Sequence, residues 1–379
     1  MIIKKNMTIK IQVFNPKIYK EDIKSVINSL KKNQISGSQN KIIENFENNF
    51  AKFVKSKYAI STSSGTTALH LCINALNLEK GSEVIVSSCT NIATALAIYH
   101  NNLIPVPIDS DAENWNIKLE LIEKNITKKT KAIIVVHFLG NPVDMNKVMK
   151  IAKKYKLYVI EDAAEAHGAK INKRLVGSIA HMGCFSFYSN KIITCGEGGA
   201  ITTNNKKLYK KIRLLKNLAF SKKRFIHYQA GFNFRLSSIQ AAMVNSQLKK
   251  INSIIKLKIK IANLYKNFLI CNKGVEFQKQ INNSLHVHWM FGIKLNRNYP
   301  TSANKLIQIL KKNGIETRTF FFSIRNQPCL KEIIKKKTPS TPVSDDLWKN
   351  GLYLPSTHHI KKKNIKKICD IINNPIKYT

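Results

Sequence analysis

Two residues, Asp162 and Lys191, have the types and surroundings needed for carbonyl chemistry. Lys191 follows a short apolar stretch at residues 183–187, and a glycine cluster at residues 196–199 comes next. Glycines there let the backbone approach a bound molecule closely. A lysine held against apolar groups loses its proton more easily and can attack a carbonyl carbon. In a chain this rich in lysine, the competing interpretation is an ordinary solvated loop lysine.

A turn of small residues offers a second element of the same site. Residues 63–67 read Ser-Ser-Gly-Thr-Thr and lie between an expected strand and an expected helix. Free backbone amides and the dipole at a helix N-terminus favour a bound anion such as phosphate. A plain helix cap is the alternative interpretation. Ser186, five residues before Lys191, could add a hydroxyl group to the same anion site.

Together these groups match the requirements of pyridoxal 5′-phosphate. Lys191 could form a Schiff base with its aldehyde, and the turn at residues 63–67 could bind its phosphate. Asp162, at the end of an apolar run, could form a salt bridge with its ring nitrogen. The ring withdraws electrons only while that nitrogen stays protonated. Spacing alone does not establish that these residues meet in space. A solvated loop lysine and a plain helix cap therefore remain alternative interpretations.

The elements that must position these residues alternate between strands and helices. Residues 132–136 are continuously apolar, which is typical of parallel strands buried on both faces. The alternation predicts an α/β fold, with a large, mainly parallel sheet and helices on both faces. Ligands of such sheets bind at the carboxyl ends of the strands, where Asp162 and His137 fall. The expected strands are residues 58–62, 83–86, 104–109, 132–137 and 157–160.

A second, smaller unit is expected after residue 250. Residues 236–268 have a helical pattern without proline, which predicts one long connecting helix. We expect a large domain at residues 1–250 and a small C-terminal α+β domain at residues 251–379. The expected strands of the small domain are residues 274–277, 287–293 and 315–320, with helices at 302–312 and from 362. Its core is expected to contain Trp289, Phe291 and Phe320 to Phe322.

The formal net charge of +41 over 379 residues raises a second class of function. Only seven of the 63 basic residues are arginine, and the 56 lysines are scattered along the whole chain. Nucleic-acid-binding proteins usually concentrate their charge and use arginine. We therefore interpret the excess as a compositional bias on solvated surfaces. It should attract anionic small molecules, and bind nucleic acid only non-specifically at low salt. A basic nucleic-acid-binding protein remains the less favoured hypothesis.

The cysteines and the apolar runs bear on the cellular location. Seven cysteines without a Cys-x-x-Cys pair favour a reducing cytoplasm, and argue against a disulfide framework or a structural zinc site. No apolar run reaches about 18 residues, so no membrane span is expected. Residues 1–6 are too short and polar for a secretory signal. We expect a cytoplasmic protein without a metal site.

Seven segments of the chain resemble the DegT-type (DegT/DnrJ) nucleotide-sugar aminotransferases, a branch of the fold-type-I pyridoxal-phosphate enzymes. The similarity runs from about residue 35 to the C-terminus. The resemblance implies the fold and the cofactor that the residues alone left open. The matching segments are residues 64–69 (SGTTAL), 114–117 (NWNI), 136–145 (VHFLGNPVDM), 161–169 (EDAAEAHGA), 185–199 (FSFYSNK with GEGG), 231–236 (GFNFRL) and 354–356 (LPS).

The resemblance implies a role for three residues around the cofactor ring. Lys191 is implied to form the Schiff base with the cofactor and to carry a proton between it and the substrate. Asp162 is implied to pair with the pyridine nitrogen. Glu165 stands where the family has Gln or Glu, close to the phenolic oxygen of the ring. Some family members carry His at the lysine position and catalyse deoxygenation, so the lysine here favours transamination. An inactive homologue with the same fold is a further alternative.

The resemblance also implies how the phosphate is held. Gly65, Thr66 and Ser186 are implied to bind the phosphate within one chain. Asn233 is implied to reach the phosphate of the neighbouring subunit, because its loop is lent to the partner in this family. A homodimer with a shared active site is therefore expected. For Asn233, the competing interpretation is a cap for the helix that follows.

The substrate expected from the resemblance is a keto nucleotide sugar. The segments around Asp162 and Lys191 resemble those of perosamine synthases, which implies amination of a 4-keto-6-deoxy nucleotide sugar by glutamate, for a polysaccharide such as an O-antigen. A 3-keto nucleotide sugar is the alternative. His137 and Arg318 are the expected substrate contacts. Two features depart from the family, namely Asn91 where an aromatic residue often stacks on the ring, and residues 317–325, which lack the usual prolines and histidine.

Overall fold

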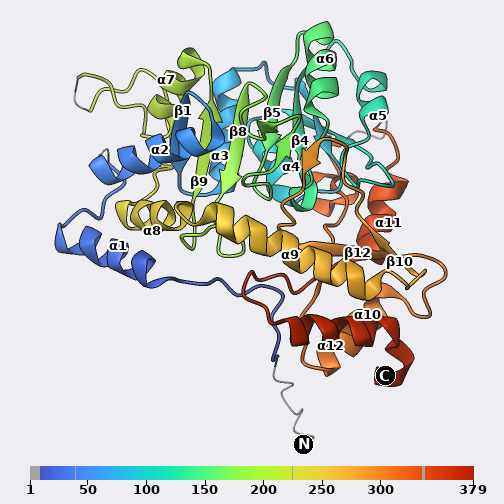
Figure 1. Ribbon diagram of the computed structural model, residues 1–379. Coiled ribbons are helices and arrows are strands. Elements are labelled where there is room, and N and C mark those ends of the chain that lie inside the picture. Colours follow the sequence, from blue (N-terminus) through green and yellow to red (C-terminus); the bar gives the residue numbers. More distant parts are fainter. Residues whose placement is uncertain (1–8, 39, 224, 335–337) are drawn as a thin grey trace, which may run out of the picture.

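The computed structural model describes residues 9–38, 40–223, 225–334 and 338–379 (Figure 1). A seven-stranded sheet, in the order β1-β9-β8-β5-β4-β2-β3, forms the larger part. The pairs between β8, β5, β4, β2 and β3 are parallel, whereas β9 is antiparallel to both of its neighbours. The expected α/β fold with a mainly parallel sheet is confirmed. The strands are β1 (Tyr58–Thr62), β2 (Glu83–Ser87), β3 (Ile104–Ile108), β4 (Thr130–Val136), β5 (Tyr158–Asp162), β8 (Met182–Ser186) and β9 (Gly199–Thr203).

Both faces of the large sheet are covered by helices. Along β4, Ile134 packs on the side of α3 (Gly65–Leu76), α4 (Ile92–Tyr99) and α7 (Lys206–Leu215). Ile133 packs on the opposite side, where α6 (Met145–Tyr155) lies. Alternate residues of a strand point to opposite faces of the sheet. Both side chains are fully buried, because helices cover both faces. The continuous apolar pattern of this strand follows from that double burial.

One edge of the large sheet collects the carboxyl ends of its parallel strands. β1 pairs with β9, and β9 pairs with β8, both antiparallel, so β1 runs in the same direction as β8. The ends of β1, β8 and β5 therefore meet at a single edge, next to the start of β9. Thr62, Ser186 and Asp162 are the last residues of these three strands. The topology thus brings the end of β1 next to the ends of β5 and β8, which follow it 100 and 124 residues later in the chain.

The expected single helix at residues 236–268 is wrong. The chain forms α8 (Ser238–Leu248) and α9 (Ile251–Leu269), with a break at Lys249 and Lys250. Neither glycine nor proline marks the break, so the local sequence gave no signal for it. Packing sets it instead, because α8 packs against α1 (Lys20–Lys31) and α2 (Lys41–Val54), whereas α9 continues towards α12 (Lys362–Asn373). Figure 1 shows α9, in gold, running from the large sheet to the C-terminal part.

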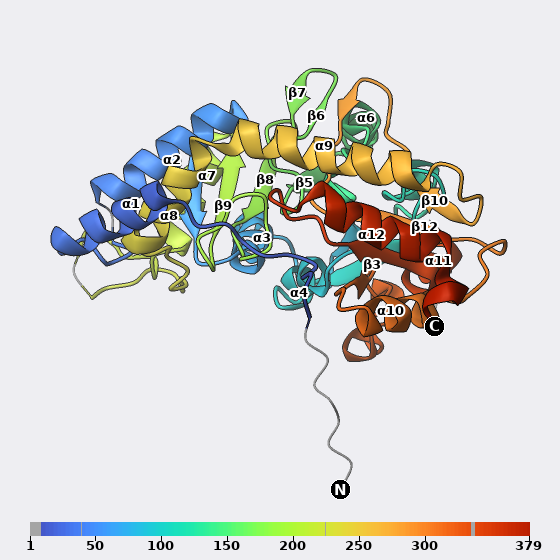
Figure 2. The same cartoon turned by 60° about the horizontal axis from the view of Figure 1, so that its bottom comes forward.

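The C-terminal part contains a four-stranded antiparallel sheet in the order β10-β12-β14-β13. A separate apolar cluster lies between this sheet and α9, α10 (Ala303–Lys312) and α12. Figure 2 shows α9 and α12 side by side over this region. The division of the chain into domains at residue 250 stays a prediction. The strands are β10 (Val275–Phe277), β12 (Phe291–Leu295), β13 (Arg318–Thr319) and β14 (Gly351–Leu354).

The expected strand at residues 287–293 begins only at Phe291, so this prediction is wrong for its first half. Residues 286–290 cross to the large sheet instead. The N–H groups of Val287 and Trp289 donate to the carbonyl oxygens of Gly140 (3.1 Å) and Leu139 (2.9 Å). Just before this segment, β11 (Ser284–Leu285) joins a small sheet with β6 (Lys170–Ile171) and β7 (Arg174–Leu175). These long-range contacts leave no local pattern in the sequence.

No helix within the described ranges combines the length and the apolar character needed to cross a membrane. Two further α-helices are α5 (Leu119–Lys124) and α11 (Pro342–Asn350).

Candidate active site

A cavity of about 310 Å³ opens at the carboxyl edge of the large sheet. It is bounded by the ends of β5 and β8, the start of α3, the loop after β8, and three segments of the C-terminal part. Six of the seven cofactor-site residues expected from the sequence line it, together with Arg318. These residues are Gly65, Thr66, Asp162, Glu165, Ser186 and Lys191.

The start of α3 offers free backbone amides to this cavity. The Ser64 side chain caps the helix by accepting from the N–H of Thr67 (3.1 Å), while the Thr67 hydroxyl accepts from the N–H of Ser64 (3.0 Å). Among the described residues, no acceptor binds the N–H groups of Gly65 and Thr66. The helix cap and the anion site are therefore compatible, because they use different amides.

Gly65 brings α3 into direct contact with β8. A Cβ atom at position 65 would lie 2.8 Å from the Ser186 Cβ, which is closer than real Cβ contacts. Any larger residue would push the helix start away from the strand end. Ser186 lies beside the free amides, and its hydroxyl accepts from the N–H of Tyr188 at 3.3 Å. The hydroxyl and the two amides form a cradle that suits a phosphate group.

Asp162 places a buried carboxylate at the floor of the cavity. Its Oδ2 accepts from the Thr94 hydroxyl at 2.8 Å, and its Oδ1 accepts from the N–H of Ala164 at 3.2 Å. Burial raises its pKa, while these two hydrogen bonds and the charge of Lys191 act in the opposite direction. Each oxygen keeps a further lone pair. A cationic N–H group placed in the cavity would therefore stabilise the ionised form.

Glu165 is a second buried carboxyl group, three residues beyond Asp162. Its Oε2 accepts from the N–H of Leu139 at 2.9 Å. Burial raises the pKa of Glu165 to about 7, against the effect of the nearby Lys191 charge. Near neutral pH this carboxyl group can therefore either donate or accept a hydrogen bond.

Lys191 projects from the turn after β8, where its N–H donates to the carbonyl oxygen of Tyr188 at 2.9 Å. Its Nζ lies 4.1 Å from the ring centroid of Trp289. Burial lowers its pKa, while the charges of Glu165 and Asp162 partly counteract the shift. A lower pKa leaves a larger fraction of the amine unprotonated, which is the form that attacks a carbonyl carbon.

His137 does not reach the cavity, and the expectation that it contacts substrate is corrected by its surroundings. The residue is fully buried. Its Nδ1 accepts from the N–H of Val143 (3.0 Å), so Nε2 carries the hydrogen and donates to Glu161 Oε2 (3.2 Å). Glu161 also accepts from three backbone N–H groups. The histidine belongs to a buried structural network beneath the sheet edge.

Asn233 also lies outside this cavity. It is exposed and bridges to Asn217 on the segment between α7 and α8. Asn91, by contrast, lines the cavity, and its side chain caps α4 by accepting from the N–H of Ala93 at 3.0 Å. Arg318 does line the cavity, and its Nη2 lies 3.3 Å from Glu316 Oε1. The Arg318 side chain is about half exposed, so its remaining N–H groups are available to an anionic ligand.

The aromatic residues expected in the core of the small domain are only partly there. Phe291 belongs to that core. Phe320 packs on Phe138 of the large part, and Phe322 packs on Trp348. Trp289 and Phe321 line the cavity instead. Sequence reasoning missed this role because the aromatic cluster carries no local signal for a ligand. Thr94 was also missed, although it lies in the first turns of α4 at the expected ligand edge, with its hydroxyl 3.2 Å from that of Thr90, which precedes the helix.

Glu165 leads to a prediction for the protein without cofactor. An unfolded glutamate ionises near pH 4.5, whereas the folded one holds its proton to about pH 7. Between these values the folded state binds more protons, so ionisation of Glu165 lowers stability as pH rises, by at most about 3 kcal/mol. We expect Glu165→Gln to remove this part of the decline in urea unfolding between pH 4.5 and 8. The exposed Glu123→Gln is the control, and identical pH curves for Glu165→Gln and wild type would refute the prediction.

Comparison with known proteins identifies the family. The DegT/DnrJ/EryC1/StrS aminotransferase family matches residues 16–373, so the similarity begins earlier than the expected residue 35. The GDP-perosamine synthase of Escherichia coli O157:H7 is 36% identical over 364 residues, which are 96% of this chain and 98% of the relative. That of Vibrio cholerae is 34% identical over 338 residues, covering 89% and 91%.

Solved structures agree in fold over nearly the whole chain. Helicobacter pylori PseC, an aminotransferase of pseudoaminic acid biosynthesis, superposes with a TM-score of 0.91 at 26% identity, covering 97% of this chain and all of PseC. DesV of S. venezuelae gives a TM-score of 0.88 at 28% identity, covering 95% of each chain. Enzymes of this family use pyridoxal phosphate. The free amides at Gly65, the carboxylate of Asp162 and the amine of Lys191 suit its phosphate, ring nitrogen and aldehyde. The chain is a pyridoxal-phosphate-dependent enzyme and belongs to the DegT/DnrJ/EryC1/StrS aminotransferase family.

Proposed function

We propose that this enzyme transfers an amino group from glutamate to a 4-keto-6-deoxy nucleotide sugar. The observation that carries the proposal is the single cavity that joins Lys191, Asp162 and the free amides of α3. The relatives support the sugar class, because GDP-perosamine synthases reach 34–36% identity over most of the chain. A 3-keto nucleotide sugar is the second candidate, favoured by two transaminases of 3-amino sugars at 30% and 32% identity.

Each residue of the cavity has a proposed task. When bound, pyridoxal phosphate supplies an aldehyde that holds the amino group and a ring that withdraws electrons. The amides of Gly65 and Thr66 and the Ser186 hydroxyl bind its phosphate. Asp162 would accept the ring N–H and so favour the cationic ring. Lys191 would bond to the aldehyde carbon and, when free of it, would move the proton of the amino-bearing carbon.

Glu165 is proposed to face the phenolic oxygen of the ring. Its carboxyl group is anchored by the N–H of Leu139, so its orientation is fixed before the ring enters. Because its pKa lies near 7, it can donate a hydrogen bond to an anionic oxygen. That bond would favour one tautomer of the bound ring over the other.

The charge around the cavity suits two anionic substrates. Glutamate brings carboxylates, and the nucleotide sugar brings a diphosphate. Arg318 is the arginine that lines the cavity, and its fork of N–H groups matches either anion. The net charge of +41 draws both substrates towards the protein by long-range attraction.

A homodimer with a shared active site is part of the proposal. The segment between α7 and α8 projects from the body, at the upper left of Figure 1. It exposes the large side chains of Phe220 (43%), Ile226 (47%) and Tyr228 (77%). Clustered exposed apolar groups are unusual unless they meet a partner. Asn233, outside its own cavity, would then reach the phosphate site of the neighbouring chain. Light scattering that gives the mass of one chain would exclude this arrangement.

We place the reaction in the cytoplasm, in the synthesis of a cell-surface polysaccharide such as an O-antigen. All seven cysteines are free thiols, which suits a reducing compartment. Recovery of the native enzyme with oxidised cysteines from outside the cytoplasm would contradict this location.

The substrate assignment is tested by a panel of keto nucleotide sugars with glutamate as donor. We expect the 4-keto-6-deoxy sugars to yield an amino sugar, identified by mass spectrometry and NMR, and the 3-keto sugars to react poorly. Lys191→Ala should lose the absorbance band of the bound cofactor and at least about 1,000-fold in rate. Lys154→Ala, on the surface, is the control. An active Lys191→Ala variant would identify the protein as something other than a transaminase.

Arg318 provides a test of substrate binding. We expect Arg318→Ala to raise the KM of glutamate or of the nucleotide sugar by about 10- to 100-fold, because a hydrogen bond to a charged group contributes about 1.5–3 kcal/mol. The KM that rises tells which anion the residue binds. Arg297→Ala, an exposed arginine outside the cavity, is the matched control. Equal kinetics in the two variants would remove Arg318 from the site.

A further inference from the structure

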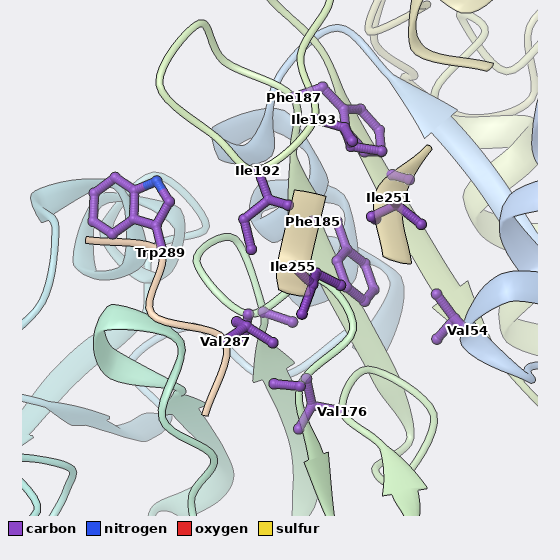
Figure 3. Packing of buried hydrophobic residues seen from close by; sticks show 14 of the residues in the cluster. Val54, Val176, Phe185, Phe187, Ile192, Ile193, Ile251, Ile255, Val287 and Trp289 are labelled. Atoms are coloured by element: carbon purple, nitrogen blue, oxygen red, sulfur yellow. The ribbon is translucent and has the colours of Figure 1, made fainter. Parts of the chain in front are cut away.

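Trp289 touches the reactive lysine, yet none of the roles above uses it. The Nζ atom of Lys191 lies over the indole face, 4.1 Å from the ring centroid. The indole Nε1 donates to the carbonyl oxygen of Asn190 at 2.7 Å, so one ring contacts both the lysine and the residue before it. Trp289 is 1% exposed. Figure 3 shows its ring at the edge of the packed group, on the left, with Val287 among the central side chains.

The indole ring is held rigidly from two sides. The backbone N–H of Trp289 donates to the Leu139 carbonyl oxygen at 2.9 Å, which fixes the residue to the segment after β4. Leu139 is also the residue whose N–H binds Glu165. From the C-terminal sheet, the ring of Tyr353 lies 6.0 Å away between centroids. The ring is therefore a preformed surface, and the flexible partner in the contact is the lysine side chain.

The contact acts on a lysine whose pKa is subject to opposing influences. Burial favours the neutral amine, whereas the carboxyl groups of Asp162 and Glu165 favour the cation. Among the described residues, no carboxylate lies within salt-bridge distance of Nζ. The negative face of an indole ring stabilises a cation at this distance. Trp289 is thus the group in direct contact with Nζ that favours the protonated form.

Other titratable groups surround this contact. His167 is buried and neutral, because burial lowers its pKa to about 3, with a smaller effect from Lys191. Tyr353 is neutral, because burial raises its pKa to about 12. Tyr188, Glu197 and Arg318 also line the cavity wall. Of these groups, the indole alone both contacts Nζ and bonds to the lysine turn.

We propose that Trp289 is a positioning residue that docks the free ε-ammonium group of Lys191 whenever the lysine is not bonded to the cofactor. The inference deepens the proposed function, because transamination releases this lysine once in every cycle. Once Nζ has taken the proton of the amino-bearing carbon, the indole face stabilises the resulting ammonium group and holds it near the ring, ready to deliver that proton. The indole N–H holds the Asn190 carbonyl, so the turn that carries the lysine does not shift when the side chain moves.

Fluorinated tryptophans at position 289 test the contact without changing its size. Each fluorine weakens the negative face of the ring, and the N–H donor to Asn190 is retained. The full-length, cofactor-free protein is mixed with pyridoxal phosphate at different pH values, and cofactor capture is followed by absorbance. Only the unprotonated lysine reacts, so the midpoint of the rate–pH curve reports its protonation. We expect the midpoint to fall stepwise with fluorine number, by about one pH unit over the series.

Trp348 provides the matched control. It is 40% exposed on α11, packs on Phe322 and does not line the cavity, so the same fluorinated series there should leave the midpoint unchanged. A constant midpoint across the Trp289 series would overturn the proposed docking while leaving the aminotransferase intact. Failure of the wild-type protein to capture the cofactor at any pH is a different result, because it would overturn the proposed function and this inference together.

Discussion

The structure depends on a carboxylate being kept out of water at the end of a parallel strand. Asp162 is 5% exposed, and a buried charge is costly unless it is paired or hydrogen-bonded. The Thr94 hydroxyl and the N–H of Ala164 supply part of that pairing, and Lys191 supplies a compensating charge. The remaining need is for a cationic ligand. A cofactor with a cationic ring N–H would supply this missing partner of Asp162, and the interaction would contribute to cofactor affinity.

The topology of the large sheet explains why residues that are far apart in the sequence meet in the candidate site. The order β1-β9-β8-β5 aligns three strand ends at one edge, so the turn after β1, Ser186 and Asp162 become neighbours. The apolar runs predicted these strands well, because a strand buried on both faces tolerates only apolar residues in its interior. The lysine and the aspartate were predicted because their chemistry needs those residue types and because the motifs around them match the family. The free amides at Gly65 followed from the small residues of the same turn.

What the sequence did not predict depends on contacts between distant segments. The break between α8 and α9 has no proline or glycine, and only the different packing partners of the two helices place it. Residues 286–290 look like a strand, yet their N–H groups bind the carbonyl oxygens of Leu139 and Gly140. His137 had the right position at a strand end but the wrong neighbours, since Glu161 and Val143 occupy both ring nitrogens. Trp289 is buried, but it packs in the cluster of the large part and lines the cavity, because its hydrogen bonds to Leu139 and Asn190 hold it there.

The free amides at the start of α3 also have a consequence for the lifetime of the protein. A phosphate that binds there binds the folded chain alone, because the unfolded chain has no such cradle. By mass action, a ligand at 100 times its dissociation constant stabilises the folded state by about 2.7 kcal/mol. Because Gly65 allows close contact between this helix start and β8, the bound phosphate would also stabilise the end of a central strand. The abundance of the enzyme in a cell would then follow the supply of vitamin B6, independently of any control of its synthesis.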